Sequence, residues 1–299
     1  MTVKTKIRLK GHESFYIREG WIRKAIKAIE EDELILTKNT AIDKLGIGAN
    51  MVKAMRYWLP AIGLTEEYRV QGSKRAQRLT DSFGKIIVSN DKFIEDIGSL
   101  ALLHYKLCTN FEQATSWYLF FNKVKAEELK KIDLPEVLNY QLLNIDPEIT
   151  FSQKSLNDDC NCIIKTYCYD REDLNNPEDN LICPFTELGL IKKVRSKNRE
   201  EIIIKDIHSG KKIDKLIILY VVIDQLKEAK SISIDKLIED ECNIGRVFNL
   251  DKNLVNEYID ELESEQYITV NRTSGLNTIY VNGLTKEEVL VEYYKGVKS

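Results

Sequence analysis

The chain has 299 residues, of which 43% are hydrophobic and 30% charged, and its formal net charge is −3. This length and apolar content predict two or three folded domains and exclude a wholly disordered chain. No apolar run approaches the ~20 residues that cross a bilayer, and residues 1–10 alternate basic with apolar side chains instead of forming a signal-peptide core. We therefore expect a cytoplasmic protein with no membrane partner, whose cysteines stay mostly reduced.

Residues 41–60 have the pattern of a helix-turn-helix. Three apolar residues with helical spacing precede two glycines at which the chain can reverse, and a second helix follows: Ala41, Ile42, Leu45, Gly46, Gly48. Asn50 is suited to cap the second helix and Pro60 to stop it. Its apolar face would bury Met51 or Val52 together with two further residues, Met55 and Leu59. Its other face would offer Asn50, Lys53, Arg56 and Tyr57 to solvent, as side chains that contact phosphates and base edges.

A hairpin is predicted directly after this helix. Residues 66–69 are suited to a strand, and the basic, glycine-containing run 71–78 is suited to the tip of a wing. Over residues 50–80 six basic side chains stand against two acids, namely Lys53, Arg56, Arg69, Lys74, Arg75 and Arg78 against Glu66 and Glu67.

Residues 1–28 are also basic, with eight basic side chains against two acidic ones. In a chain of negative net charge, this concentration of positive charge indicates a surface for double-stranded DNA. The expected DNA contacts are Asn50, Lys53, Arg56, Tyr57, Lys74, Arg75 and Arg78. The alternative is a winged helix that docks another protein, with the charges on a solvated face.

Beyond residue 90 the pattern changes to long amphipathic helices. Apolar residues recur with helical spacing over residues 93–107, 117–124 and 155–167. The runs 125–129 and 135–140 extend this helical layer, and 169–180 is expected to be a polar loop.

The last third of the sequence has a second pattern of helices and a hairpin. Helices over residues 216–226, 235–243 and 252–263, a strand over 231–234 and a hairpin around Ser274 and Gly275 indicate a second winged-helix-like domain. Between residues 235 and 265 acids outnumber bases by ten to three, so this domain is expected to pack on the rest of the protein or to dock another protein.

The predicted fold class is therefore mainly α with small β wings. We expect an N-terminal winged helix-turn-helix domain over residues 1–90, a central helical domain over 91–210 and an acidic winged-helix-like domain over 211–299.

Residues 11–21 contain the candidate catalytic and phosphate-binding side chains. His12 and Glu13 form a possible acid and base, or metal-ligand, pair, and Arg18 is a fixed cation that could clamp a phosphate. Glu19, with Glu95 and Asp96 more distant in sequence, would be the further carboxylates of a metal-dependent nuclease. Glu13 could instead cap a helix or form an ion pair with Arg18. His104, whose side chain could also take part in catalysis, could instead be a core histidine on an apolar helix face.

Two other kinds of site are not favoured by the sequence. The chain lacks a Gly-x4-Gly-Lys-Ser/Thr motif, so no nucleotide cofactor is expected. No Cys-x2-Cys pair occurs among Cys160, Cys162, Cys168 and Cys183, which are expected to be small apolar fillers and not metal ligands.

Several ordered motifs resemble those of the domain-of-unknown-function 4007 family, and the resemblance spans about residues 8–285. They are Gly11-His12-Glu13-Ser14-Phe15 with Arg18 and Gly20-Trp21; Leu45 to Val52 with Arg56-Tyr57-Trp58; Glu95-Asp96; Leu102 to Tyr105; Thr115 to Tyr118 with Phe121-Asn122; and Pro184 with Glu187 to Ile191.

This resemblance implies a component of a bacterial DNA phosphorothioation system that defends against phage. The implied activity is a nickase, which opens one strand of duplex DNA with Mg²⁺ or Mn²⁺ so that sulfur can be inserted. The implied partners are a cysteine desulfurase, an ATP-pyrophosphatase-like sulfur transferase and an ATPase. Since no catalytic motif is carried over from the family, Glu13, His12 and Arg18 rest on their chemistry alone. The alternative is a non-catalytic DNA-binding adaptor or a transcriptional regulator.

Overall fold

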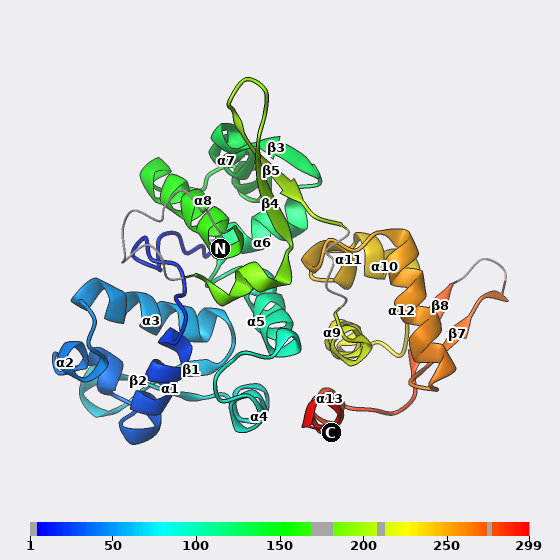
Figure 1. Cartoon of the computed structure of the whole chain (residues 1–299), viewed down its shortest axis with the longest axis horizontal. Coiled ribbons are helices and arrows are strands. Elements are labelled where there is room, and N and C mark those ends of the chain that lie inside the picture. Colours follow the sequence, from blue (N-terminus) through cyan, green and yellow to red (C-terminus); the bar gives the residue numbers. More distant parts are fainter. Residues whose placement is uncertain (1–4, 169–181, 208–212, 274–276, 299) are drawn as a thin grey trace. The chain divides into compact units, whose positions relative to one another are not determined.

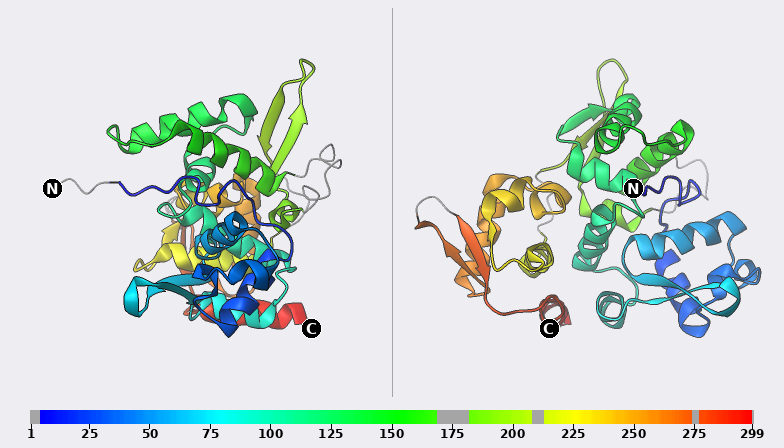
Figure 2. Two further views of the ribbon diagram at one scale, coloured as in Figure 1. Left: turned by 90° about the vertical axis from the view of Figure 1, so that its left-hand side faces the viewer. Right: turned by 180° about the vertical axis from the view of Figure 1, so that it is seen from behind.

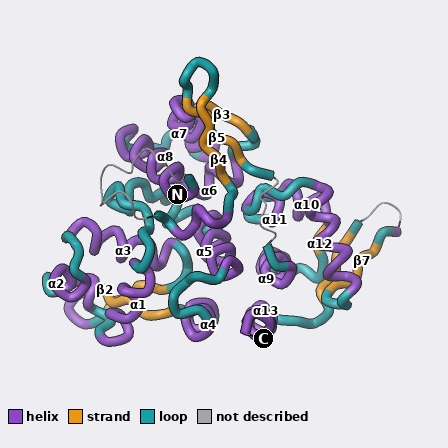
Figure 3. The backbone as a smooth tube through the Cα atoms, viewed as in Figure 1, coloured by secondary structure: helices purple, strands orange, loops and turns teal. Residues whose placement is uncertain are grey.

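The computed structural model describes residues 5–168, 182–207, 213–273 and 277–298. The chain forms two compact units, residues 1–205 and 206–299, each of which is described here by itself. Both are mainly helical and carry small antiparallel sheets, which confirms the predicted fold class at this level (Figures 1 and 3).

Several finer sequence predictions concern domain boundaries and loops. The three-domain division with boundaries at residues 90 and 210 stays a prediction. The predicted polar loop at 169–180 and the turn at Ser274 and Gly275 lie outside the described residues. Among the helices of the described ranges, none is both long and apolar enough to cross a bilayer.

The first unit opens with an irregular segment, which is followed by short helices and one hairpin. In order these are α1 (Trp21–Glu31), η1 (Ile35–Thr37), α2 (Ala41–Leu45), α3 (Ala49–Ala61), β1 (Thr65–Arg69), η2 (Gln71–Ser73), β2 (Arg75–Leu79) and α4 (Phe83–Asn90). Gly46 takes a left-handed φ of 65° after α2, a conformation that glycine adopts without a Cβ clash. The predicted helix, turn, helix and hairpin are all present.

Two details of α3 differ from the prediction. The helix begins at Ala49, so Asn50 lies inside its first turn and does not cap it. Pro60 does not stop the helix, which continues to Ala61. A proline inside a helix leaves the carbonyl four residues earlier without its usual donor. Here that carbonyl belongs to Arg56 and accepts a hydrogen bond of 2.7 Å from Gln77 Nε2 on β2, so the helix tolerates the proline.

A helical layer follows in the same unit and has α5 at its centre. Its elements are α5 (Ile97–Thr109), α6 (Thr115–Tyr118), the π-helix η3 (Leu119–Lys123), η4 (Lys131–Asp133), α7 (Leu134–Ile145), α8 (Gln153–Tyr167) and η6 (Pro184–Leu188). Nearly every residue of α5 is buried, and the Asp96 side chain caps this helix by accepting from Ser99 N. His104 is buried in α5 with its Nδ1 2.7 Å from the Tyr167 hydroxyl, as expected of a core histidine.

A three-stranded antiparallel sheet in this layer was not predicted. Its order is β3 (Glu128–Lys130), β5 (Glu201–Lys205), β4 (Ile191–Arg195), so the expectation of helix over residues 125–129 is wrong. The buried Lys205 at the end of β5 donates to the carbonyls of Phe120 and Val124, at 2.7 and 2.5 Å, and so joins the sheet to the end of η3. The β4–β5 hairpin projects beyond α7 and α8 in both views of Figure 2.

The second unit is built around α9 (Lys215–Leu226), which is strongly apolar as predicted. It continues with β6 (Ile232–Ser233), α10 (Ile234–Glu239), α11 (Ile244–Val247), α12 (Lys252–Ser264), β7 (Ile268–Asn271), β8 (Thr278–Val281) and α13 (Lys286–Lys298). β8 pairs with both β6 and β7, and α13 packs on α9. The predicted helices and hairpin are confirmed, whereas α13 was not predicted.

Candidate functional site

The segment before α1 has an unusual backbone. Lys10, Glu13 and Ser14 have left-handed φ values of 56°, 50° and 69°. Such values are uncommon in residues with a Cβ and persist only where surrounding contacts enforce them. At Gly11 a Cβ would lie 2.3 Å from the ring of Tyr57, so only glycine lets the segment approach α3 this closely. This strained run, residues 10–14, is termed the N-terminal loop below.

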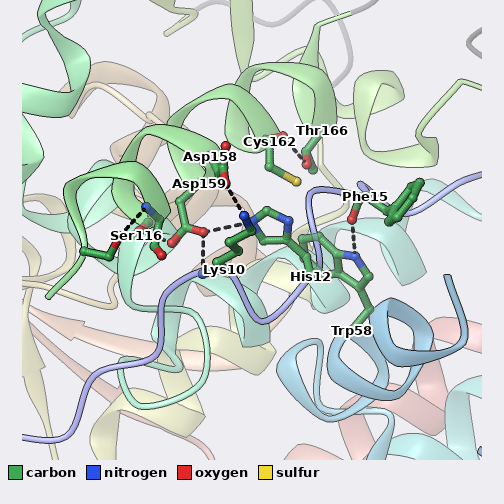
Figure 4. A network of polar contacts seen from close by, with 11 residues as sticks. Lys10, His12, Phe15, Trp58, Ser116, Asp158, Asp159, Cys162 and Thr166 are labelled. Atoms are coloured by element: carbon green, nitrogen blue, oxygen red, sulfur yellow. Dashed lines mark hydrogen bonds and ion pairs between the residues drawn. The ribbon is translucent and has the colours of Figure 1, made fainter. Parts of the chain in front are cut away.

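A buried polar network fixes the N-terminal loop to α6 and α8 (Figure 4). Asp159 of α8 is its centre, and its Oδ1 accepts from Lys10 N and from His12 Nε2, both at 2.8 Å. Its Oδ2 accepts from Ser116 Oγ at 2.5 Å. At the edge of the network, Lys10 Nζ pairs with Asp158 Oδ2 at 2.6 Å. Because both oxygens of Asp159 are used, the carboxylate holds three separate segments of the chain together.

Aromatic rings enclose His12. Its ring stacks on Trp58 at 5.9 Å between centroids and meets Trp117 edge-on at 5.6 Å. Trp58 Nε1 also donates to the carbonyl oxygen of Phe15 at 2.8 Å, which holds the chain just after the loop.

The prediction that Tyr57 faces solvent is wrong, because its side chain is only 2% exposed. Its ring lies beside His12 and Trp58, and the guanidinium of Arg8 lies 4.8 Å from its centre. Burial raises the pKa of Tyr57 well above its ordinary value. The N-terminal segment therefore covers the helix face that α3 would otherwise expose.

The buried network does not form the predicted pair of His12 and Glu13. His12 is 0% exposed and bonded to Asp159, while its Nδ1 has no hydrogen-bond partner within the described ranges. Ser116 donates to Asp159 and not to His12, so the serine and the histidine do not form a nucleophile–base pair. The arrangement supports the loop, and Glu13, half-buried in that loop, is the acidic group that it presents.

Arg18 lies at a different site. It is 9% exposed and its guanidinium carbon lies 5.6–5.9 Å from the ring centres of Phe15, Tyr16 and Trp21. Within the described part of the chain it forms no ion pair with Glu13 or any other carboxylate, and its Nε has no acceptor. It lines a cavity of about 620 Å³, to which Glu19, Arg23 and Glu95 also contribute. The structure therefore brings together Arg18 and two of the predicted further carboxylates, but not His12.

The predicted DNA-binding residues lie on α3 and the β1–β2 hairpin. Asn50, Lys53 and Lys74 are exposed. Arg56 Nε is 2.6 Å from a Glu67 carboxylate oxygen, and Arg75 reaches the other oxygen at 3.3 Å.

Arg78 pairs with Glu66 at 2.8 Å and lies over the ring of Tyr68. Arg75 and Arg78 belong to strand β2 and not to the hairpin tip. Tyr57 thus differs from the other six predicted DNA contacts in being buried.

The buried network around Asp159 and the cavity lined by Arg18 differ in how well they could hold a divalent cation. Mg²⁺ usually keeps several waters and takes one or two carboxylates together with phosphate oxygens. The carboxylate of Asp159 is buried and already accepts three hydrogen bonds, so it does not fit such an ion. Glu19 and Glu95 are exposed and line an open cavity, which does fit. In the described ranges no three His, Cys, Asp or Glu side chains gather as a ready-made metal cage.

The cysteines behave as buried apolar residues. All six are free thiols, and Cys108, Cys160, Cys162 and Cys183 are buried. Burial raises the pKa of Cys183 to about 12 and also raises the pKa values of Cys160 and Cys162. Thiols held protonated in this way are poor metal ligands.

Asp159 and Ser116 were missed because they lie far from His12 in sequence. One signal for Asp159 was available. It falls three residues after Leu156 and four before Ile163, on the apolar stripe of α8, where an unpaired carboxylate would be costly. An acid on such a stripe predicts a buried partner but does not say which residue supplies it.

Comparisons with known proteins agree with this fold. No curated protein matches the chain. A crystal structure of SspB with a bound magnesium ion superimposes with a TM-score of 0.85 and 27% identity, covering 97% of this chain and 89% of the other. A second crystal structure of SspB gives a TM-score of 0.82 at the same identity and coverage. The family of proteins of unknown function DUF4007 matches residues 9–294. The chain therefore belongs to the DUF4007 family.

Proposed function

We propose that this chain is an SspB-like protein of a bacterial DNA phosphorothioation system that acts against phage, and that it binds duplex DNA and nicks one strand. The observation that carries the proposal is the match to SspB over nearly the whole chain, including a form with magnesium bound. The proposed partners are the cysteine desulfurase, the ATP-pyrophosphatase-like sulfur transferase and the ATPase of the same system.

Residues 1–90 are proposed to be the DNA-binding winged helix-turn-helix domain. In this domain α3 is the recognition helix and the β1–β2 hairpin is the wing. Support comes from the exposure of Asn50, Lys53 and Lys74 on these elements, and from Arg56, Arg75 and Arg78, which cluster on the same hairpin and helix. Glu66 and Glu67 hold these arginines in the free protein, and phosphates would compete for them on binding.

Glu13 is proposed to be the catalytic carboxylate. A strained loop anchored by a buried network is a means of holding one side chain in place, and residues with such backbone strain cluster at functional sites. His12 then has a positioning role through Asp159, and Arg18 would bind a phosphate. When bound, Mg²⁺ would stabilise charge on the departing oxygen, with Glu19 and Glu95 as the exposed carboxylates available to hold it.

The second candidate function is a DNA-binding adaptor or regulator without catalysis. It is favoured by the burial of His12 and its bond to Asp159, which leave Glu13 without the histidine predicted to be paired with it. The two functions agree on the DNA-binding surface and differ only in strand cleavage. For either one, the acidic second unit, residues 206–299, is proposed to dock a partner protein and not DNA.

The DNA-binding part of the proposal is tested by titrating a short duplex at several salt concentrations. Replacing Lys53 and Lys74 with alanine should weaken binding to any sequence and lower the salt slope by about one for each lost phosphate contact. Lys230→Ala, an exposed lysine of the second unit, is the matched control and should bind as the wild type does. Unchanged affinity and slope in the double variant would remove this surface from the proposal.

A further inference from the structure

The cavity lined by Arg18 combines three features that favour an anion. The first is the N-terminus of α1, an eleven-residue helix that has no side-chain cap and no acid in its first turn. In the described part of the chain, the backbone N–H groups of Ile22 and Arg23 have no acceptor. Such free N–H groups, together with the helix dipole, attract negative charge.

The second feature is the buried guanidinium of Arg18. A buried cation normally has a carboxylate partner, because burying an unpaired charge is costly. Arg18 instead lies over three aromatic rings, and its Nε, fully shielded from solvent, has no acceptor. A ligand with several acceptor oxygens would satisfy the donors that the protein leaves unpaired.

The third feature is Arg23, which lies in the first turn of α1 and lines the same cavity. Its guanidinium lies 4.5 Å from the ring centre of Phe93, so a ring holds this second cation at the cavity wall. Arg18, Arg23 and the N-terminus of α1 thus line the same cavity of about 620 Å³.

Three glutamates, Glu19, Glu95 and Glu187, also line the cavity, but all three are exposed. Solvent and salt screen exposed carboxylates more strongly than they screen a buried guanidinium. The buried Arg18 is therefore the charge in the cavity that solvent and salt screen least.

We propose that this cavity binds a phosphate group, held by Arg18, Arg23 and the N-terminus of α1. Its source is either a DNA strand or free inorganic phosphate. As a DNA site the cavity rests on the proposed function, whereas its affinity for inorganic phosphate does not.

The test is calorimetric titration of the full chain with inorganic phosphate, with chloride at equal ionic strength as the reference. Arg23→Ala should weaken phosphate binding at least about tenfold, because it removes a charge-assisted hydrogen bond. Lys27→Ala is the matched control, because it removes the same charge from an exposed position of the same helix outside the cavity, and should bind as the wild type does. Arg18→Lys, which keeps the charge but loses the planar fork, should also weaken binding, and circular dichroism would verify its fold.

The outcomes separate the sources and the two proposals. If phosphate competes with a nicked duplex, the source is a DNA strand: competition with the 5′-phosphate duplex alone indicates the strand end, and competition with the 5′-hydroxyl duplex as well indicates a phosphate within the strand. If it binds without competing, the source is free phosphate. If the wild type binds no phosphate, or Arg23→Ala and Arg18→Lys bind as it does, the inference is overturned. DNA binding and nicking would then still be decided by their own assays.

Discussion

The buried carboxylate of Asp159 should be one of the most sensitive positions of the first unit. Asp159→Ala would leave three donors without an acceptor: the part-buried backbone N–H of Lys10, the buried ring Nε2 of His12 and the buried hydroxyl of Ser116. Removing one partner of a buried pair costs about 3–5 kcal/mol. In a unit of this size each kcal/mol lowers the Tm by about 2–4 °C. We therefore expect the unfolding transition of the first unit to fall by about 6–20 °C.

Tryptophan fluorescence measures this transition selectively. The chain has three tryptophans, Trp21, Trp58 and Trp117, and all belong to the first unit. Asp158→Ala is the matched control, because its ion pair with Lys10 is partly exposed and its loss should lower the transition far less. If Asp159→Ala unfolded within 2 °C, on the order of 1 kcal/mol, of the Asp158 variant, Asp159 would not anchor the N-terminal loop.

Three further predictions concern separate parts of the molecule. Glu67→Gln should raise affinity for duplex DNA by up to about fivefold at low salt, since it frees Arg56 and Arg75, and weaker binding in a filter assay would contradict this. The pKa of Glu201 is lowered mainly by its hydrogen bond from Lys131, so its stabilising effect is present at neutral pH and lost as the pH falls below the ordinary glutamate range of about 4.3. Glu201→Gln should therefore be less stable than the wild type at pH 7 in urea unfolding, with the difference shrinking as the pH falls below the ordinary glutamate range, and a constant difference would refute this. Cys162 and Cys183 should resist alkylation by N-ethylmaleimide at pH 8 until the protein unfolds, because burial keeps them protonated, and rapid labelling of the native protein by mass spectrometry would show otherwise.

Local patterns predicted much of the fold. α8 and α12 have apolar residues at helical spacing and α9 is an almost continuous apolar run, and the structure places all three within a few residues of the predicted ranges. The sheet β3–β5–β4 was missed because β3 has only three residues, and pairing across about 70 residues leaves no local signal. Length alone did not decide which elements were found, since α13 was missed although it has 13 residues, as many as α12.

The candidate site was predicted less well for the same reason. The sequence singles out the N-terminal loop, but the partner of His12 lies 147 residues away on α8. The burial of Tyr57 could not be inferred from α3 alone, because it depends on Gly11 allowing a distant segment to cover the helix. The cavity at Arg18 likewise joins residues 18–23, 93–95 and 182–187, which only the tertiary fold brings together.

The proposed function requires the purified protein itself to open one strand of DNA. The most direct measurement is conversion of supercoiled plasmid to open circle with Mg²⁺ or Mn²⁺, with and without excess chelator. We expect metal-dependent conversion by the wild type and by Glu30→Gln, a control at an exposed glutamate of α1. Glu13→Gln should still retard the plasmid on a gel but leave it supercoiled. A wild-type protein that retards the plasmid with either metal and never opens it would contradict the nickase and leave a DNA-binding adaptor.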